Sequence, residues 1–252
     1  MTTLRFTVLG SGTPLPDADR GPAGFLIEVD GRAWLVDGGS GTLQRLVRAG
    51  VRPRDLAGGV YSHQHPDHCA DLVPLLFAFR AGGRETDYPI WAGAGFADFF
   101  RRLGDAWGRA MEPRTAKVVL HEHALDGVVT SELGGLVLQT APANHSACAL
   151  HLRFEAAGHA IVFSGDTGPS DSLVTLATAA SLLVVECGAV SPMAGHLCPD
   201  QVVDLVARAR PHQVWLTHLH PGVDADALVR AVCATGVPAT RVADLDTIHF
   251  TG

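Results

Sequence analysis

The chain has 252 residues, 47% of them hydrophobic, and a formal net charge of −7. This length and composition allow a large buried core and exclude a disordered chain. No stretch is dense in Lys or Arg, so strong nucleic-acid binding is not expected. No signal peptide and no apolar run of about 18 residues is present, and the five cysteines show no paired spacing. We therefore expect a cytoplasmic protein that does not associate with membranes.

Short apolar runs bounded by turn residues predict strands along the whole chain. In the first half they lie at Arg5–Leu9, Phe25–Val29, Ala33–Val36 and Gly59–Tyr61. In the second half they lie at Lys117–Leu120, Leu136–Thr140, Leu150–Phe154, Ala160–Phe163, Leu182–Val185 and Val214–Thr217.

Helical patterns lie between several of these strands. They cover Thr42–Ala49, Ala70–Phe79, Phe96–Trp107, Ser172–Ala180, Pro199–Arg208 and Ala225–Ala234. Strands that alternate with helices favour a layered α/β fold. A loop joins the first two strands, so a simple doubly wound sheet is not expected. No internal repeat or linker is evident, and residues 1–252 are predicted to form a single domain.

The strongest chemical signal is the segment from Ser62 to His68, which reads SHQHPDH. It follows a predicted strand and precedes a predicted helix. Alternation places His63 and His65 on the same side, where both can bind one ion. Asp67 and His68 follow the turn at Pro66 and can face a second ion. Imidazole nitrogens and carboxylate oxygens are common zinc ligands.

Later positions repeat this local pattern, with His or Asp directly after a predicted strand. They are His145, Asp166 and His218, and His196 precedes a predicted helix in Gly195-His196-Leu197. In α/β folds, sites gather where strands end and loops begin. Several such residues beside the dense motif are therefore hard to treat as chance.

This set resembles the metallo-β-lactamase superfamily, whose motif is His-x-His-x-Asp-His followed by a lone His, a bridging Asp and a final His. The segments LGSGTP (9–14), VDGGSG (36–41), GHL (195–197) and LTH (216–218) resemble its ribonuclease Z-like and compact phosphodiesterase branch in particular. The resemblance implies a four-layer αββα sandwich with a dinuclear metal site at the strand ends.

The resemblance also implies a ligand set. One ion would be held by His63, His65 and His145, and the other by Asp67, His68 and His218, with Asp166 bridging the two. Asp37 would lie behind the ligands and fix their orientation. All ligand atoms are nitrogen or oxygen, which suits zinc first and also manganese or iron.

Two such ions would hold a bridging hydroxide as the nucleophile, which Asp67 could orient. In ribonuclease Z-like phosphodiesterases, a His in the region of His196 contacts the phosphate and protonates the leaving alkoxide. We take His196 as the general acid. Glu186 is expected to hydrogen-bond His196, and we count Asp67, His196 and Glu186 as the catalytic residues.

The substrate is the open question. A small phosphodiester, such as a cyclic nucleotide, fits the branch best. A lactone, carboxyl ester or aryl sulfate ester could use the same metal site. A tRNA 3′-processing endonuclease is disfavoured, because only 21 positions separate His145 from Asp166 and leave no room for an RNA-binding arm. A non-catalytic metal-binding accessory protein is the alternative from another class, and the complete ligand set argues against it.

The remaining expectations concern surfaces and individual histidines. Related enzymes are often homodimers, and the apolar segment Leu72–Phe79 is expected to form a pocket wall or a dimer face. Substrate specificity is expected to depend on three predicted loops, which are Arg80–Pro89, Arg109–Ala116 and Ala189–Ala194. The first two are predicted to be mobile surface segments. His220 is equally compatible with structure and with substrate contact, whereas His151 is expected to be an ordinary surface or edge residue.

Overall fold

The computed structural model describes residues 2–252, which divide into two compact units. The N-terminal unit consists of Arg5–Ala124 and Asp244–His249. The C-terminal unit consists of residues 2–4, Leu125–Ala243 and Phe250–Gly252. A single domain over residues 1–252 therefore stays a prediction.

The sheet of the N-terminal unit has seven strands in the order β14-β1-β2-β3-β4-β5-β6. The strands are β1 (Thr3–Gly10), β2 (Gly24–Val29), β3 (Arg32–Val36), β4 (Gly58–Tyr61), β5 (Tyr88–Gly93), β6 (Val118–His123) and β14 (Thr247–Thr251). Strands β2 and β3 pair antiparallel, whereas β3, β4, β5 and β6 run parallel to one another. The carboxyl ends of β3 and β4 therefore lie side by side at one edge of this sheet.

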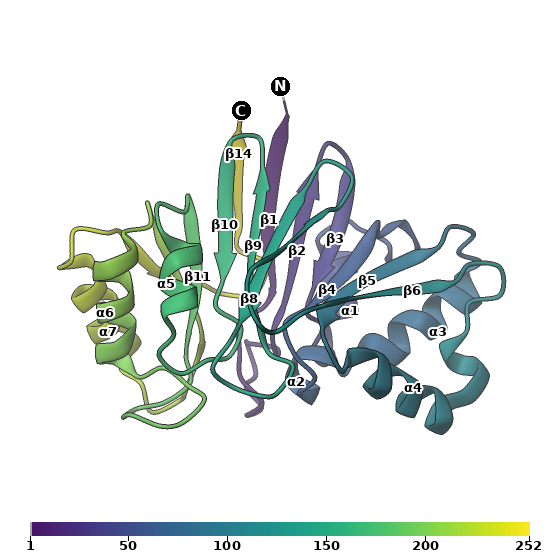
Figure 1. Ribbon diagram of the computed structural model, residues 1–252, viewed down its shortest axis with the longest axis horizontal. Helices are drawn as coiled ribbons and strands as arrows, with labels where there is room; N and C mark the ends of the chain where they lie inside the picture. The colour runs from purple at the N-terminus through teal and green to yellow at the C-terminus, as the bar shows by residue number, and fades with distance from the viewer. Residues whose placement is uncertain (1) are drawn as a thin grey trace. The chain divides into compact units, whose positions relative to one another are not determined.

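Helices cover this sheet on one side (Figure 1). They are α1 (Thr42–Arg48), α2 (Pro66–Cys69), α3 (Leu72–Gly82) and α4 (Phe96–Trp107), with 3-10 turns at Pro53–Asp55 and Gly108–Met111. The buried face of α3 consists of Leu72, Leu75, Leu76 and Phe79. Their spacing of three and four residues places them on one stripe of a helix. Burying each such side chain stabilises the fold by roughly 1.5–3 kcal/mol.

The sheet of the C-terminal unit also has seven strands, in the order β13-β12-β11-β10-β9-β8-β7. The strands are β7 (Val129–Glu132), β8 (Val137–Pro142), β9 (Leu150–Ala156), β10 (His159–Phe163), β11 (Leu182–Cys187), β12 (Val214–Leu219) and β13 (Ala239–Arg241). Strands β7 to β10 pair antiparallel in turn, and β10 to β13 run parallel.

The directions of these strands determine where the candidate site residues lie. Because β9 runs antiparallel to both β8 and β10, the carboxyl ends of β8, β10, β11 and β12 all lie at the same sheet edge as the amino end of β9. His145, Asp166, Glu186 and His218 come from those carboxyl ends. The topology therefore brings residues far apart in the sequence to one edge of this sheet.

The helices of the C-terminal unit are α5 (Asp171–Ala177), α6 (Pro199–Ala209) and α7 (Ala225–Cys233), and Figure 1 shows them together beside β11. Helix α6 buries Val202, Leu205, Val206 and Ala209. These residues join a core cluster with Leu183, Val185, Val214 and Leu216 of the sheet. Each unit thus has one sheet layer, one helix layer and a core of its own.

All predicted helices and strands are present, with ends shifted by a few residues. Four strands were not predicted: β5, β7, β13 and β14. Strands β7, β13 and β14 are edge strands, and their side chains are partly or fully exposed. An edge strand needs no continuous apolar run, so its sequence carries a weak signal. Strand β5 begins inside the segment Arg80–Pro89, for which the sequence predicts a loop.

The prediction of a mobile surface segment at Arg80–Pro89 is wrong in part, because Arg84 and Tyr88 within it are buried. The Arg84 guanidinium donates hydrogen bonds to the carbonyls of Arg54, Leu56, Thr86 and Asp87. Backbone acceptors therefore satisfy a buried cation that would otherwise be costly. Sequence alone did not show that these carbonyls converge on one arginine.

The structure also bears on membrane association and on the cysteines. None of the helices formed by residues 2–252 is long and apolar enough to cross a membrane. None of the five cysteines forms a disulfide.

Candidate metal and acid–base site

In the N-terminal unit, the ends of β3 and β4 are joined by the carboxylate of Asp37. One oxygen of Asp37 accepts a hydrogen bond from the Ser62 amide at 2.7 Å. The other accepts from the Ser62 hydroxyl at 2.7 Å and from His68 Nδ1 at 2.8 Å. All three residues are buried. Because Nδ1 of His68 carries the proton, Nε2 is left as the nitrogen that can bind a metal ion.

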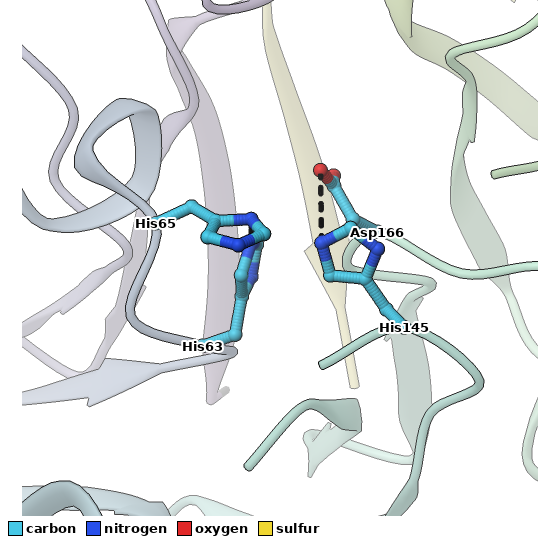
Figure 2. Close-up of side chains that lie close together, drawn as sticks. All are labelled: His63, His65, His145 and Asp166. Atoms are coloured by element: carbon cyan, nitrogen blue, oxygen red, sulfur yellow. Dashed lines mark hydrogen bonds and ion pairs between the residues drawn. The ribbon is translucent and has the colours of Figure 1, made fainter. Parts of the chain in front are cut away.

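The same hydrogen bonds determine the tautomer of His63. The single hydroxyl proton of Ser62 is donated to Asp37, so the Ser62 oxygen accepts from His63 Nδ1 at 3.1 Å. Nε2 of His63 is then available for a metal ion, and it lies 3.0 Å from Nδ1 of His65. Figure 2 shows these two rings meeting. Two ligand nitrogens at this distance can both reach one ion at about 2.0–2.1 Å.

Helix α2, which carries Asp67 and His68, packs closely against a glycine pair. The amide of Gly38 donates to the His68 carbonyl at 2.6 Å, and a Cβ at Gly39 would overlap the carbonyl oxygen of Asp67. Only glycine permits this close approach of two backbones. Asp67 itself is buried and lies 3.6 Å from His68 Nε2 through its Oδ2.

In the C-terminal unit, Asp166 presents its two oxygens to two different histidines. Oδ2 lies 3.9 Å from His145 Nε2, as Figure 2 shows, and Oδ1 lies 3.6 Å from His218 Nε2. All three side chains are nine-tenths or more buried. A carboxylate with one oxygen toward each histidine has the arrangement that a bridging ligand needs.

The orientation of His145 is fixed by a residue that the sequence did not single out for this role. Its Nδ1 donates a hydrogen bond to the Gly195 carbonyl at 2.8 Å, which again leaves Nε2 for a metal ion. Gly195 has a φ of 83°, and a Cβ on it would lie 3.0 Å from His145 Nδ1. The Gly195-His196-Leu197 segment therefore holds a predicted ligand as well as carrying His196.

His196 hydrogen-bonds Glu186, as predicted. The distance from His196 Nδ1 to Glu186 Oε1 is 2.9 Å, and Glu186 is almost completely buried. Burial raises the pKa of the Glu186 carboxyl, and the hydrogen bond with His196 acts in the opposite direction. The His196 ring lies 5.0 Å from the ring of His145 and 6.1 Å from that of His218, measured between centroids.

The backbone is strained at two of these positions. Asp37 has a φ of 54° and His218 a φ of 49°, in the left-handed region that residues other than glycine rarely adopt. Strain of this kind persists where the surrounding structure over-determines it, and it clusters at functional sites. At His218 it coincides with a register shift between β11 and β12, at Glu186 and Cys187.

His220 has a structural role. Its Nδ1 accepts a hydrogen bond from the Gly222 amide at 3.0 Å, and its own amide donates to the Cys187 carbonyl at 2.9 Å. Both bonds shape the turn after β12. Substrate contact by His220 stays a prediction.

Helix α3 forms a pocket wall, which is one of the two roles predicted for its apolar sequence, and the dimer face stays a prediction. A pocket of about 600 Å³ lies within the N-terminal unit, and Gln64 and Pro66 of the Ser62–His68 segment form part of its lining. Phe77 of α3 and Trp107 of α4 also line it, and both are more than half exposed. Ala110, in the predicted loop Arg109–Ala116, completes one side.

Known proteins share this fold and these motifs. A family model described as a beta-lactamase superfamily domain matches residues 32–219. The chain belongs to the beta-lactamase superfamily. The matched range includes all seven predicted metal ligands, and it confirms the family predicted from the motifs.

One relative within the superfamily is a ribonuclease Z from Mycobacterium sp. (strain KMS). It is 30% identical over 258 residues, which cover 92% of this chain and 90% of that protein. Among solved structures, the metallo-beta-lactamase fold protein YhfI from Bacillus subtilis has a TM-score of 0.84 at 23% identity, covering 99% of this chain and 100% of YhfI. A diphosphatase from the PhnP family has a TM-score of 0.75 at 19% identity, covering 99% and 98%. The structural likeness confirms the predicted α/β sandwich fold class.

The interpretation of His151 as a surface or edge residue is wrong. The residue lies in β9, an interior strand, and its side chain is completely buried. Nδ1 donates to the Ser164 carbonyl at 2.6 Å, and Nε2 lies 3.0 Å from the Ser170 hydroxyl. Burial lowers the pKa of His151 to about 4, partly offset by the bond to Ser164. The residue is therefore neutral at pH 7.

Replacing Asp37 with Asn should weaken metal binding, because the carboxylate that accepts from His68 would become an amide. We expect affinity for Zn²⁺ to fall by roughly 10–100-fold, measured by competition with a chromogenic chelator. Asp105→Asn, at an exposed carboxylate of α4, is the matched control and should bind as the unmodified protein does. Equal affinity in both variants would contradict the role of Asp37.

The buried neutral His151 should make stability fall in acid. The unfolded chain has the ordinary histidine pKa near 6.5, so it takes up a proton that the folded protein does not as pH falls from about 6.5 to about 4. Over that window the loss approaches about 3 kcal/mol.

Denaturant unfolding of the metal-free protein and of His151→Asn, at pH 7.5 and pH 4.5, would measure this effect. The other titrating groups are common to both proteins. The stability advantage of the unmodified protein should therefore shrink at pH 4.5, and an unchanged advantage would contradict the assignment.

Proposed function

We propose that this protein is a hydrolase with two divalent metal ions, most simply zinc, that cleaves a small phosphodiester such as a cyclic nucleotide. One ion would be held by His63, His65 and His145, and the other by Asp67, His68 and His218, with Asp166 bridging. Family membership and the fixed tautomers of three of the histidines support the assignment. Manganese or iron would also suit these nitrogen and oxygen ligands.

When bound, a pair of such ions supplies a hydroxide nucleophile near neutral pH and polarises the phosphoryl oxygen. The residues of the chain then have separate tasks. Asp67 carries a carboxylate that can orient the nucleophile and accept its proton. Asp37, Ser62 and Gly195 hold the ligand imidazoles in the tautomers that leave Nε2 available.

The single observation that carries the phosphodiester proposal is the His196–Glu186 pair. With Nδ1 on the buried Glu186 carboxylate, Nε2 of His196 is the atom that can hold a proton for a leaving oxygen. The His196 ring lies beside those of His145 and His218, where such a proton would be needed. An alkoxide is a poor leaving group, so a general acid accelerates its departure by about 10²–10⁴-fold.

The segment between His145 and Asp166 supports a small substrate. It consists mainly of β9 and β10, joined by a turn at Ala157 and Gly158. Both strands pair within the sheet of the C-terminal unit. No part of this segment extends as an arm that could grip RNA.

Cleavage of a tRNA precursor is the second candidate. The observation that favours it is the 30% identity with a mycobacterial ribonuclease Z, across most of both chains. The net charge of −7 argues against extensive phosphate contacts, since those need clustered Lys or Arg. We therefore rank the small phosphodiester first.

A cytoplasmic location and a homodimer stay predictions. The absence of disulfides is compatible with the first, and size measurement by light scattering would test the second.

Purified protein loaded with Zn²⁺ or Mn²⁺ should contain about two ions per chain. It should hydrolyse bis-p-nitrophenyl phosphate and at least one of the 2′,3′- or 3′,5′-cyclic nucleotides. A precursor tRNA with a 3′ trailer is the competing substrate in the same panel. Faster cleavage of the precursor would favour the second candidate, and turnover of lactones or aryl sulfates alone would reject both. No bound metal after reconstitution would reject the metal site.

His196→Ala should lower turnover without lowering metal content, because His196 is assigned to the leaving group and not to an ion. The loss should reach about 10²–10⁴-fold for a cyclic nucleotide, whose leaving group is an alkoxide. It should be much smaller for a p-nitrophenyl ester, whose leaving group needs no protonation. His212→Ala, at an exposed histidine, is the control. Loss of a metal ion from His196→Ala would show that His196 is a ligand.

A further inference from the structure

The loop that carries Asp166 is tied at both ends to one buried side chain. This loop runs over residues 164–170, from the end of β10 to the N-cap of α5. His151 Nδ1 donates to the carbonyl of Ser164, the first residue of the loop, at 2.6 Å. Its Nε2 lies 3.0 Å from the hydroxyl of Ser170, the last residue. A single imidazole therefore spans the ends of the seven-residue segment in which Asp166 lies.

The direction of the first bond follows from its partner. A carbonyl can only accept, so Nδ1 of His151 carries the proton. Nε2 lies 3.0 Å from the Ser170 hydroxyl, which also lies 2.7 Å from the Ser172 hydroxyl. Ser170 in turn accepts from the Leu173 amide as the N-cap of α5. The imidazole thus couples β9, the start of the loop and the first turn of α5.

Strand β11, on the other side of β10, also holds the loop. The Ser164 amide donates to the Val184 carbonyl at 3.0 Å, and the Thr167 amide donates to Glu186 at 2.9 Å. Both of these partners lie on β11. The His151 bonds act from β9, on the opposite flank of β10. Asn144, which follows β8, also holds the loop, because its carbonyl accepts from the Gly168 amide at 2.9 Å and its amide donates to the Thr167 hydroxyl at 3.1 Å. The His151 bonds are the contacts from β9, and they lie at the two ends of the loop.

We propose that His151 is a positioning residue that sets where the Asp166 carboxylate points. This inference rests on the proposed function only in taking Asp166 as a metal ligand. Ser164 is two residues before Asp166, and Gly165 between them has a φ of 56°. Because only one residue separates Ser164 from Asp166, the position of the Ser164 carbonyl sets the start of the segment that carries Asp166, whose oxygens face His145 and His218.

A purely structural histidine would give a different result from a positioning one. If His151 only filled the core, its replacement would lower stability and leave metal affinity unchanged. If it positions Asp166, affinity should depend on which hydrogen bond is kept. The two bonds come from different ring nitrogens, so different substitutions can separate them.

Three variants make this separation. His151→Asn keeps a donor near the Nδ1 position and can still bond to Ser164. His151→Gln places its amide near the Nε2 position, so it can still bond to Ser170 and loses the bond to Ser164. His151→Leu removes both. His159→Asn, at a half-buried histidine in neighbouring β10, is the matched control.

Affinity for Zn²⁺ is measured by chelator competition, together with the number of ions bound per chain and the melting temperature. We expect His151→Leu and His151→Gln to lose roughly 10–100-fold in affinity, as partners behind a ligand do. His151→Asn should stay within a few-fold of the unmodified protein. If His151→Leu fails to fold, the comparison of His151→Asn with His151→Gln still tests whether the bond to Ser164 controls metal affinity.

The proposal is overturned if His151→Gln binds Zn²⁺ as tightly as the unmodified protein. It is also overturned if affinity tracks melting temperature across all variants, including the control. Metal affinity is independent of substrate, so a protein without phosphodiesterase activity leaves this test intact. A protein that binds no metal would instead reject the proposed function.

Discussion

A neutral imidazole can bind a metal ion only through the nitrogen that its other hydrogen bond leaves without a proton. In this protein, hydrogen-bond acceptors hold the proton on Nδ1 of three histidines and leave Nε2 for the ion. The acceptor is Asp37 for His68, Ser62 for His63 and the Gly195 carbonyl for His145. These acceptors come from different loops, and each loop has to be in place before its histidine can serve.

The backbone accepts local strain and close approach to meet this requirement. Asp37 and His218 adopt left-handed conformations, and Gly38 and Gly39 let α2, which carries Asp67 and His68, pack directly on their backbone. Such features cost free energy and are kept only where the surrounding contacts enforce them. The large apolar cores of the two units, each formed by a sheet and its own helices, supply that enforcement.

The chemistry of the site is more general than its function. Many hydrolases of the superfamily could use the same seven ligands, and a metal-bound hydroxide does not distinguish an ester from a phosphodiester. The pair of His196 and the buried Glu186 is the reason we propose a substrate with a poor leaving group, since only such a group needs a proton donor. The 30% identity with a ribonuclease Z and the fold shared with a PhnP-family diphosphatase do not name a substrate.

The sequence by itself determined the family, the buried strands except β5, every α-helix except the short α2, and the set of candidate ligands, because the motif is dense and strongly apolar runs leave a clear pattern. It did not reveal the edge strands β7, β13 and β14, whose half-exposed residues carry little signal and whose pairing depends on neighbours distant in sequence. Nor did it assign His151 or Gly195. A lone histidine in a strand and a glycine before a histidine look ordinary until the strand order places them against Ser164 and His145. Tertiary structure decided those roles, because a hydrogen bond between distant residues exists only once the sheet has brought its strand ends to one edge.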